Sequence, residues 1–241
     1  MRKFKKSIKT VMKYIYILIL TQVFLSMSAC QSDETKNQTN ARSLFINYEV
    51  RYLEDEKELR GLAYFKQGDS IRTAVSKDFS NVTFQSSAMK KQNLGARGSR
   101  YILNRKGSYS SNLDFSYNNN EGIPINYDLS MPAVDAFSIK EGKIQKSKGA
   151  TIVWNGKALD ASQSLVLMFT DKDNQSSSIS IKGPSQVSKV FIPSSDLSRL
   201  TLGEGQLYMV KKQVLKTQEQ NQRVFSIVEY YTSAIDINVV D

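Results

Sequence analysis

Residues 44–52 read Leu-Phe-Ile-Asn-Tyr-Glu-Val-Arg-Tyr, and their alternation sets the expected class of structure. Apolar side chains recur at every second position from 44 to 52, and polar ones lie between them at Asn47, Glu49 and Arg51. A period of two with β-branched and aromatic residues is typical of a half-buried strand. The segment therefore predicts a β-strand with one face in a core.

The same reading extends over the rest of the chain. Further strands are expected at residues 59–66, 70–75, 82–84, 101–103, 113–117, 125–129, 151–154, 165–170, 178–181, 189–192, 206–215, 223–231 and 235–239, with another near Phe137. The continuous apolar run 165–170 favours a strand buried on both faces. The single expected helical turn is 193–200, with Ser194 or Ser195 as its N-cap.

Short strands at this spacing are typical of β-sandwiches. Pro132 breaks the pattern, because proline cannot donate to a central ladder. We therefore expect an all-β protein with two antiparallel β-sandwich (immunoglobulin-like) domains in tandem, residues 43–131 and 133–241. A single larger sandwich is the alternative.

The first 29 residues differ in character from the rest. Six basic side chains and no acid fall in residues 1–13, and an uncharged, largely apolar stretch follows from Tyr14 to Ala29. This is the layout of a secretory signal peptide. The stretch is short for a permanent anchor, since a helix needs about 20 apolar residues to span a bilayer.

The signal ends at Met27-Ser28-Ala29-Cys30, which contains the only cysteine of the chain. These residues resemble the lipobox of bacterial lipoproteins. The resemblance implies cleavage before Cys30, a diacylglyceryl group on its thiol and an acyl group such as palmitate on the new amine. Two or three acyl chains hold a protein stably on a membrane. The alternatives are an ordinary signal peptide in which Cys30 has no role, or an uncleaved anchor.

Residues 30–42 are then the lipidated N-terminus and a polar tether. Asp33-Glu34 is similar to the export signal that takes lipoproteins of the Bacteroides group to the outer face of the outer membrane. Residues 165–171, 182–184 and 192–193 add a loose resemblance to uncharacterised surface lipoproteins of that group. The expected location is the outer membrane, exposed at the cell surface, with a periplasm-facing lipoprotein as the alternative.

The net charge of +10 misleads when it is taken over the whole chain. Removing the six basic side chains of the signal from the total of 33 leaves 27 basic and 23 acidic residues, or about +4. The basic balance that would suggest a nucleic-acid partner thus lies mostly in the discarded segment. We expect no nucleic-acid partner.

The absence of histidine closes several chemistries. A Ser-His-Asp or Cys-His catalytic site and a zinc site built from Cys and His are excluded. Ser87-Ala88-Met89-Lys90 matches S-x-x-K, but its S-D-N and K-T-G partners are missing. Asp171–Gln175 hints at calcium but lacks the glycine and glutamate of the helix–loop–helix site, so we expect a hairpin turn. No catalytic residue, cofactor or metal ligand is assigned.

Two weaker motifs remain in the first half. Arg100, Tyr101, Arg105 and Tyr109 form a candidate ligand patch with the neighbouring basic residues, since interleaved cations and rings can bind an anionic glycan. The simpler interpretation is a solvated loop with its aromatics in the core. Asp69-Ser70-Ile71 is similar to the O-glycosylation acceptor of exported Bacteroides-group proteins, which would place a glycan on Ser70. Trp154 is interpreted as core rather than as a sugar platform.

Three classes of function stay open. The preferred one is a non-catalytic binding or adhesion module for a glycan or an envelope protein, held to the membrane by lipid. The second is a structural subunit of an outer-membrane complex, which would need an exposed edge strand or apolar face. The third is a histidine-independent carboxylate hydrolase acting on glycans. Its candidate acids are Glu49, Glu229 and Asp236.

Overall fold

The computed structural model describes residues 42–241, which form one compact unit of β-structure. The strands are β1 (Ser43–Leu53), β2 (Glu58–Gly68), β3 (Val75–Ser76), β4 (Ser80–Phe84), β5 (Ser87–Ala88), β6 (Lys90–Asn93), β7 (Ser99–Lys106), β8 (Asn112–Asn118), β9 (Pro124–Ser130), β10 (Phe137–Ile139), β11 (Ile144–Gln145), β12 (Ala150–Trp154), β13 (Gln163–Asp171), β14 (Ser176–Lys182), β15 (Lys189–Ile192), β16 (Gly203–Glu219), β17 (Gln222–Tyr231) and β18 (Ile235–Val240). The helical elements are η1 (Gly95–Arg97) and α2 (Ser194–Leu197). The signal peptide, Cys30 and the tether expected from the sequence lie outside the described residues.

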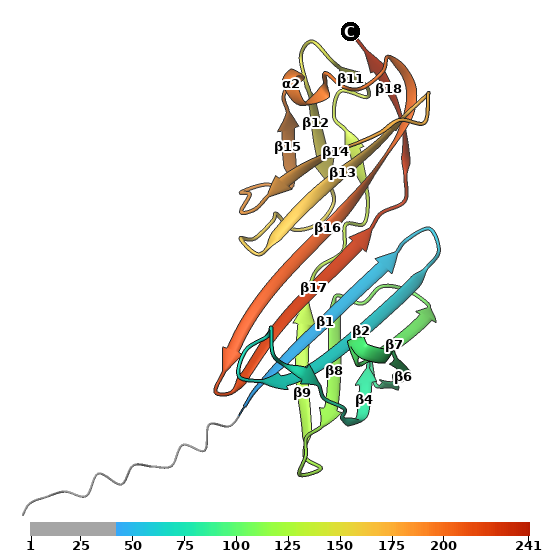
Figure 1. Ribbon diagram of the computed structural model, residues 1–241. Coiled ribbons are helices and arrows are strands. Elements are labelled where there is room, and N and C mark those ends of the chain that lie inside the picture. Colours follow the sequence, from blue (N-terminus) through green and yellow to red (C-terminus); the bar gives the residue numbers. More distant parts are fainter. Residues whose placement is uncertain (1–41) are drawn as a thin grey trace, which may run out of the picture. The chain divides into compact units, whose positions relative to one another are not determined.

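One broad sheet runs through both halves of the described chain (Figure 1). Its main path is β11-β18-β16-β17-β1-β2-β7-β6, and β13 and β14 extend it from the other side of β16. The 17-residue strand β16 joins the halves, because its first part pairs with β13 and β18 while its second part pairs with β17. We call this sheet the broad sheet.

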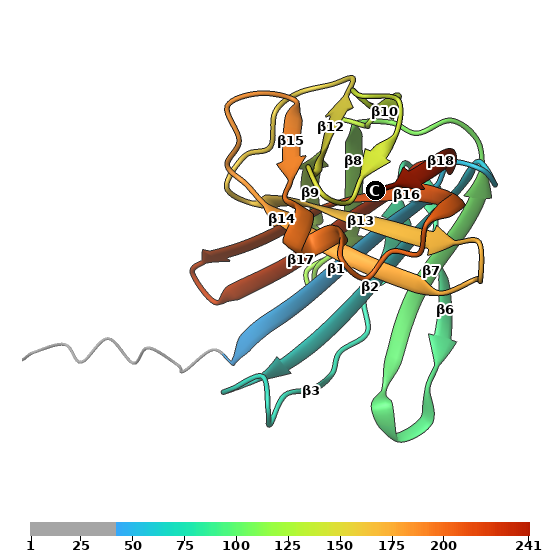
Figure 2. The ribbon, with the colours of Figure 1, turned by 90° about the horizontal axis from the view of Figure 1, so that it is seen from above.

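Two smaller sheets, β5-β4-β8-β9 and β10-β12-β15, complete the fold. Tyr48 of β1 stacks on Phe115 of β8 with ring centroids 4.3 Å apart, so the first small sheet packs on the broad sheet. Ile152 of β12 and Leu167 of β13 are fully buried in the same core. Figure 2 shows β8, β9, β12 and β15 on one side of β13, β16, β17 and β1. The all-β class with sandwich-like sheets is confirmed.

Burial along β16 shows that both small sheets lie on one side of the broad sheet. Leu207, Met209, Lys211 and Gln213 are buried, and they alternate with half-buried or exposed residues through most of the strand. Residues two apart on a strand share a face. The other face of the broad sheet therefore has no second sheet over it within residues 42–241. We call it the open face.

The pairing of strands departs from a purely antiparallel tandem arrangement. β1 pairs in parallel with β17 over ten residues, from Leu44–Gln222 to Leu53–Tyr231, and β11 pairs in parallel with β18. β1 belongs to the expected first domain and β17 to the second, so the sheet crosses the boundary at residues 131–133. The division into two domains that fold separately stays a prediction.

Three local expectations are corrected. Residues 70–74 form a turn rather than a strand, and only Val75–Ser76 pair with β2. β13 alternates between buried and half-buried residues, because its second face belongs to the open face. The N-cap of α2 is Pro193, with no capping hydrogen bond from a side chain, so neither Ser194 nor Ser195 serves as the cap.

Candidate functional site: the open face of the broad sheet

Strand register brings the outward side chains of β17, β1 and β2 into rows across the open face. Directly paired residues point to the same side of a sheet. The rows are Arg223–Phe45–Lys66, Phe225–Asn47–Tyr64, Ile227–Glu49–Leu62 and Glu229–Arg51–Arg60. The first three rows carry aromatic or aliphatic groups, and the fourth carries only charges. The open face thus has an apolar end, near the beginning of β1, and a charged end.

The apolar end is hollowed into a groove of about 1060 Å³, which we call the open-face groove. The side chain of Phe45, which is 8% exposed, forms its floor. Ile71, in the turn between β2 and β3, lines one side and is 57% exposed. Clefts that hold small ligands are mostly apolar and enclose about 300–1,000 Å³. The open-face groove is large enough for such a ligand.

Three cations line the open-face groove: Lys66, Lys216 and Arg223. The Arg223 guanidinium lies 5.7 Å from the ring centroid of Phe45, and Lys216 Nζ lies 5.8 Å from that of Phe225. Within residues 42–241 none of the three has a carboxylate oxygen within 4.0 Å. Rings attract these cations but leave their charge uncompensated.

A second, smaller hollow of about 140 Å³ lies at the charged end, lined by Glu49, Arg51, Arg60 and Glu229 among others. Glu229 pairs with Arg51 at 3.0 Å and with Lys212 at 3.3 Å. Its Oε2 also accepts a hydrogen bond from the Tyr231 hydroxyl at 3.2 Å. The charges of this hollow therefore largely compensate one another.

Two of the three acids proposed for hydrolysis share this hollow, and the third does not. Glu49 and Glu229 both line it, whereas Asp236 lies on β18, where it pairs with Gln206. Glu49 accepts a hydrogen bond from Asn47 at 2.8 Å, and Glu229 is surrounded by donors. Glu229 therefore belongs to a surface ion-pair network with Arg51 and Lys212. The described residues also contain no group of three Asp, Glu, Cys or His side chains placed to hold a metal.

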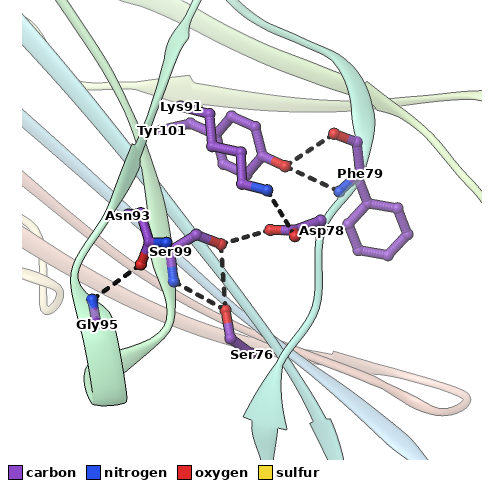
Figure 3. Close-up of polar contacts among 8 residues, drawn as sticks. All are labelled: Ser76, Asp78, Phe79, Lys91, Asn93, Gly95, Ser99 and Tyr101. Atoms are coloured by element: carbon purple, nitrogen blue, oxygen red, sulfur yellow. Dashed lines mark hydrogen bonds and ion pairs between the residues drawn. The ribbon is translucent and has the colours of Figure 1, made fainter.

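The structure does not bring the predicted patch Arg100, Tyr101, Arg105 and Tyr109 onto one surface. Tyr101 is 5% exposed, and its hydroxyl donates to Phe79 O at 2.8 Å and accepts from Phe79 N at 2.9 Å (Figure 3). In the same view Lys91 pairs with Asp78 at 2.6 Å, so this neighbouring cation is compensated. The network ties the segment after β3 to the β6–β7 hairpin.

The other three patch residues, Arg100, Arg105 and Tyr109, each have a hydrogen-bond partner within the fold. The hydroxyl of Tyr109 donates to Met131 O at 2.8 Å, and burial raises its pKa. Arg100 donates to Gln92 at 2.9 Å and Arg105 to Gln85 at 3.3 Å. Tyr101 is buried, and the half-buried ring of Tyr109 packs on Tyr52 and Tyr230, so the four residues do not form one surface of exposed rings. A glycan site framed on these four residues is not carried further.

The remaining candidates have structural settings. Trp154 is 5% exposed, and its Nε1 donates to Lys157 O at 3.1 Å, which places it in the core. Ser70 is exposed in the turn after β2, where glycosylation remains a prediction. Ser87 lies on β5 and Lys90 on β6, so no helix presents them as S-x-x-K requires. Asp171 accepts from Asp173 N and Gln175 N, which makes this segment a turn.

Sequence reasoning missed the open face. The signal was in strand 223–231, which reads Arg-Val-Phe-Ser-Ile-Val-Glu-Tyr-Tyr and has apolar residues on both faces. Val224 and Val228 supply the core, so Phe225 and Ile227 must project from the other side. Two-sided hydrophobicity in a strand whose outer face is uncovered marks an interaction surface.

Among the described residues no helix is long and apolar enough to span a membrane. No protein-family model matches the chain, and no curated protein resembles it in sequence. Among solved structures, the FN1–FN3 domains of chicken CNTN1 align with 83% of this chain and 69% of that chain, at 9% identity and a TM-score of 0.28. Murine CEACAM1b aligns with 81% of this chain and 100% of that chain, at 9% identity and a TM-score of 0.24. Likeness at this level assigns neither a family nor a function.

Proposed function

We propose that the chain is a lipid-anchored, non-catalytic binding module of the bacterial cell envelope, and that it binds its partner on the open face. The observation that carries the proposal is the open-face groove, where three uncompensated cations and the exposed Ile71 surround an apolar floor at Phe45. Apolar surface gathered in one place on a folded protein usually meets a partner. Cys30, at the end of the signal, supplies the expected anchor.

The location follows from the sequence features around the anchor. Lipid on Cys30 and the polar tether would hold the folded unit at a membrane surface. Asp33-Glu34 supports export to the outer face of the outer membrane. The open-face groove begins at Phe45, only three residues after Arg42, so the tether enters the fold beside the proposed binding surface.

Introduced thiols can test anchoring, exposure and binding together. A lipidated Cys30 has no thiol, so the wild-type chain should not react with a membrane-impermeant maleimide. Lys216→Cys puts one thiol at the open-face groove, and Lys143→Cys puts a matched one on an exposed turn elsewhere. On intact cells both variants should react, and Lys216→Cys should react more slowly than it does in the purified chain.

A different result of this assay would contradict each part of the proposal. Reaction of the wild-type chain would show a bare thiol at Cys30 and contradict lipidation. Labelling of both variants only after the cells are broken would contradict surface display. Equal rates at Lys216→Cys in cells and in the purified chain, with Lys143→Cys also unchanged, would contradict binding at the open face.

A second candidate function, a structural subunit of an envelope complex, is favoured by strand β14. Within the described residues β14 pairs only with β13, and its outer positions Ser176, Ser178 and Ser180 are exposed and uncharged. Lys182, at the end of β14, is its only charged residue, and an edge strand with so little charge can accept a strand from another chain. Ser178→Lys should then dissociate the complex in a native gel, and an unchanged complex would remove this candidate.

A further inference from the structure

The lining of the open-face groove is unbalanced in charge. It contains the cations Lys66, Lys216 and Arg223 and one acid, Glu49. Lys216 and Arg223 are exposed beside the buried floor residue Phe45, so the positive charge lies at the rim. The hollow at the charged end of the same face is lined by two cations, Arg51 and Arg60, and two acids, Glu49 and Glu229. The positive excess is therefore greater in the groove and favours an anionic occupant.

The floor of the groove restricts the kind of anion. Its middle is aromatic, with Phe45, Phe225 and Tyr64 from three adjacent strands. The backbone amides and carbonyls of these central strands are used in the β-ladders, so the face offers none of the main-chain hydrogen bonds that hold a peptide strand at a sheet edge. Asn47, one of the neutral polar groups in the lining, already donates to Glu49. A peptide strand or a polyhydroxyl glycan would leave its polar groups poorly paired here.

An amphipathic anion meets both conditions, because its apolar part covers the rings while its charged head meets the rim. We infer that the open-face groove binds a single membrane lipid with a phosphomonoester head, its acyl chains over Phe45 and Phe225 and its phosphate among Lys66, Lys216 and Arg223. A phosphomonoester carries roughly −1.5 to −2 charges at neutral pH, which offsets three cations and one carboxylate. The guanidinium of Arg223 suits bidentate contact with phosphate oxygens.

The inference rests on the proposed function, because the anchor is what holds the groove near the bilayer. The volume of about 1060 Å³ lies just above the usual range for small-ligand sites, as acyl chains require. Ile71, exposed in the turn beside β3, would close over the chains. The lipid is thus a ligand of the folded unit and is distinct from the acyl groups expected on Cys30.

The test uses the mature full chain, extracted in a neutral detergent and examined by native mass spectrometry with dioctanoylphosphatidic acid. The variant Lys66→Gln/Lys216→Gln/Arg223→Gln removes the charges of the groove. The control Arg51→Gln/Arg60→Gln/Lys212→Gln removes three cations from the charged end of the same face. Wild type and control should each bind one lipid, and the groove variant should bind about tenfold more weakly or worse, since hydrogen bonds to charged groups are the strong ones.

Thermal melts of all three proteins verify that they are folded. If the groove variant does not fold, Ile71→Asp takes its place, because this exposed residue lines the groove without supporting the core. The inference would be overturned if the groove variant bound dioctanoylphosphatidic acid as tightly as wild type does. It would also be overturned if wild type bound dioctanoylphosphatidylcholine, decanoate or hexaglutamate as tightly as it binds dioctanoylphosphatidic acid. The same spectra show the mass on Cys30: missing acyl groups would refute the anchor, whereas acyl groups without a lipid adduct would refute only the groove.

Discussion

Gly61 marks the closest approach of two sheets, and its replacement tests their packing. It lies on β2, directly opposite the ring of Phe84 on β4. A Cβ at this position would lie 2.4 Å from Phe84 Cδ1, 2.8 Å from Cγ and 2.9 Å from Cε1. Phe84 is fully buried and stacks on Phe115 with centroids 4.5 Å apart, so its ring cannot move toward solvent. Gly61→Ala must therefore push the sheets apart.

Overpacking of this kind costs about 1–3 kcal/mol, and in a domain of this size each kcal/mol lowers Tm by about 2–4 °C. We expect the Tm of Gly61→Ala, followed by far-UV circular dichroism, to fall by roughly 2–12 °C. The sign of the Tm change is informative, because Ala ordinarily stabilises a strand relative to Gly by about 0.5–1 kcal/mol.

Phe84→Ala provides the matched relief, since it removes Cγ, Cδ1 and Cε1, the three ring atoms that meet the new Cβ. The double variant should recover part of the loss, with a coupling free energy above about 0.5 kcal/mol in a double-mutant cycle. A Tm for Gly61→Ala equal to or above that of wild type would refute the described packing of β2 on β4.

Three further predictions concern charge and burial. Burial opposes ionisation of Glu54, but hydrogen bonds from Lys57 and Tyr230 outweigh it and lower its pKa below 4.5. The stabilising contribution of the Glu54 carboxylate is therefore complete above that value and is lost as pH falls through the lowered pKa. The Tm difference between wild type and Glu54→Gln should then shrink from about pH 7 to about pH 3. A Tm difference that stays constant over this range would contradict the prediction. Trp154, the only tryptophan, is 5% exposed, so its emission should be blue-shifted and resist acrylamide quenching, whereas emission like that of free tryptophan would contradict its burial. Lys211 is fully buried, donates to Pro132 O at 3.0 Å, and has its pKa lowered by burial. Lys211→Met should change the free energy of unfolding by less than about 1 kcal/mol, or raise it. A loss above about 3 kcal/mol would show that the charge is needed for stability.

Local alternation predicted most strands, because it records one face turned to a core. Residues 44–52, 113–117 and 223–231 are strands close to the predicted bounds. Residues 70–74 misled because they also alternate, yet Gly68 packs against Ala74 where the chain turns. Alternation indicates which residues of a strand face the core, but it does not indicate which other strand pairs with that strand.

The pairing of β1 with β17 illustrates that limit. These strands are separated by most of the chain, and their parallel register depends on the full course of the sheet. The candidate patch fails for the same reason, because it was chosen from residues that are close in sequence. Arg100 and Tyr101 are neighbours on one strand, so their side chains project to opposite faces of the sheet. The open-face groove draws on β1, β2, β16 and β17, which only the fold brings together.

The anchor remains the feature on which location and role both depend. Cells given an alkyne analogue of palmitate, followed by fluorophore coupling and a gel, measure it directly. The account predicts a labelled mature chain for wild type and an unlabelled precursor for Cys30→Ala. An unlabelled wild-type chain, or equal labelling of Cys30→Ala, would contradict it.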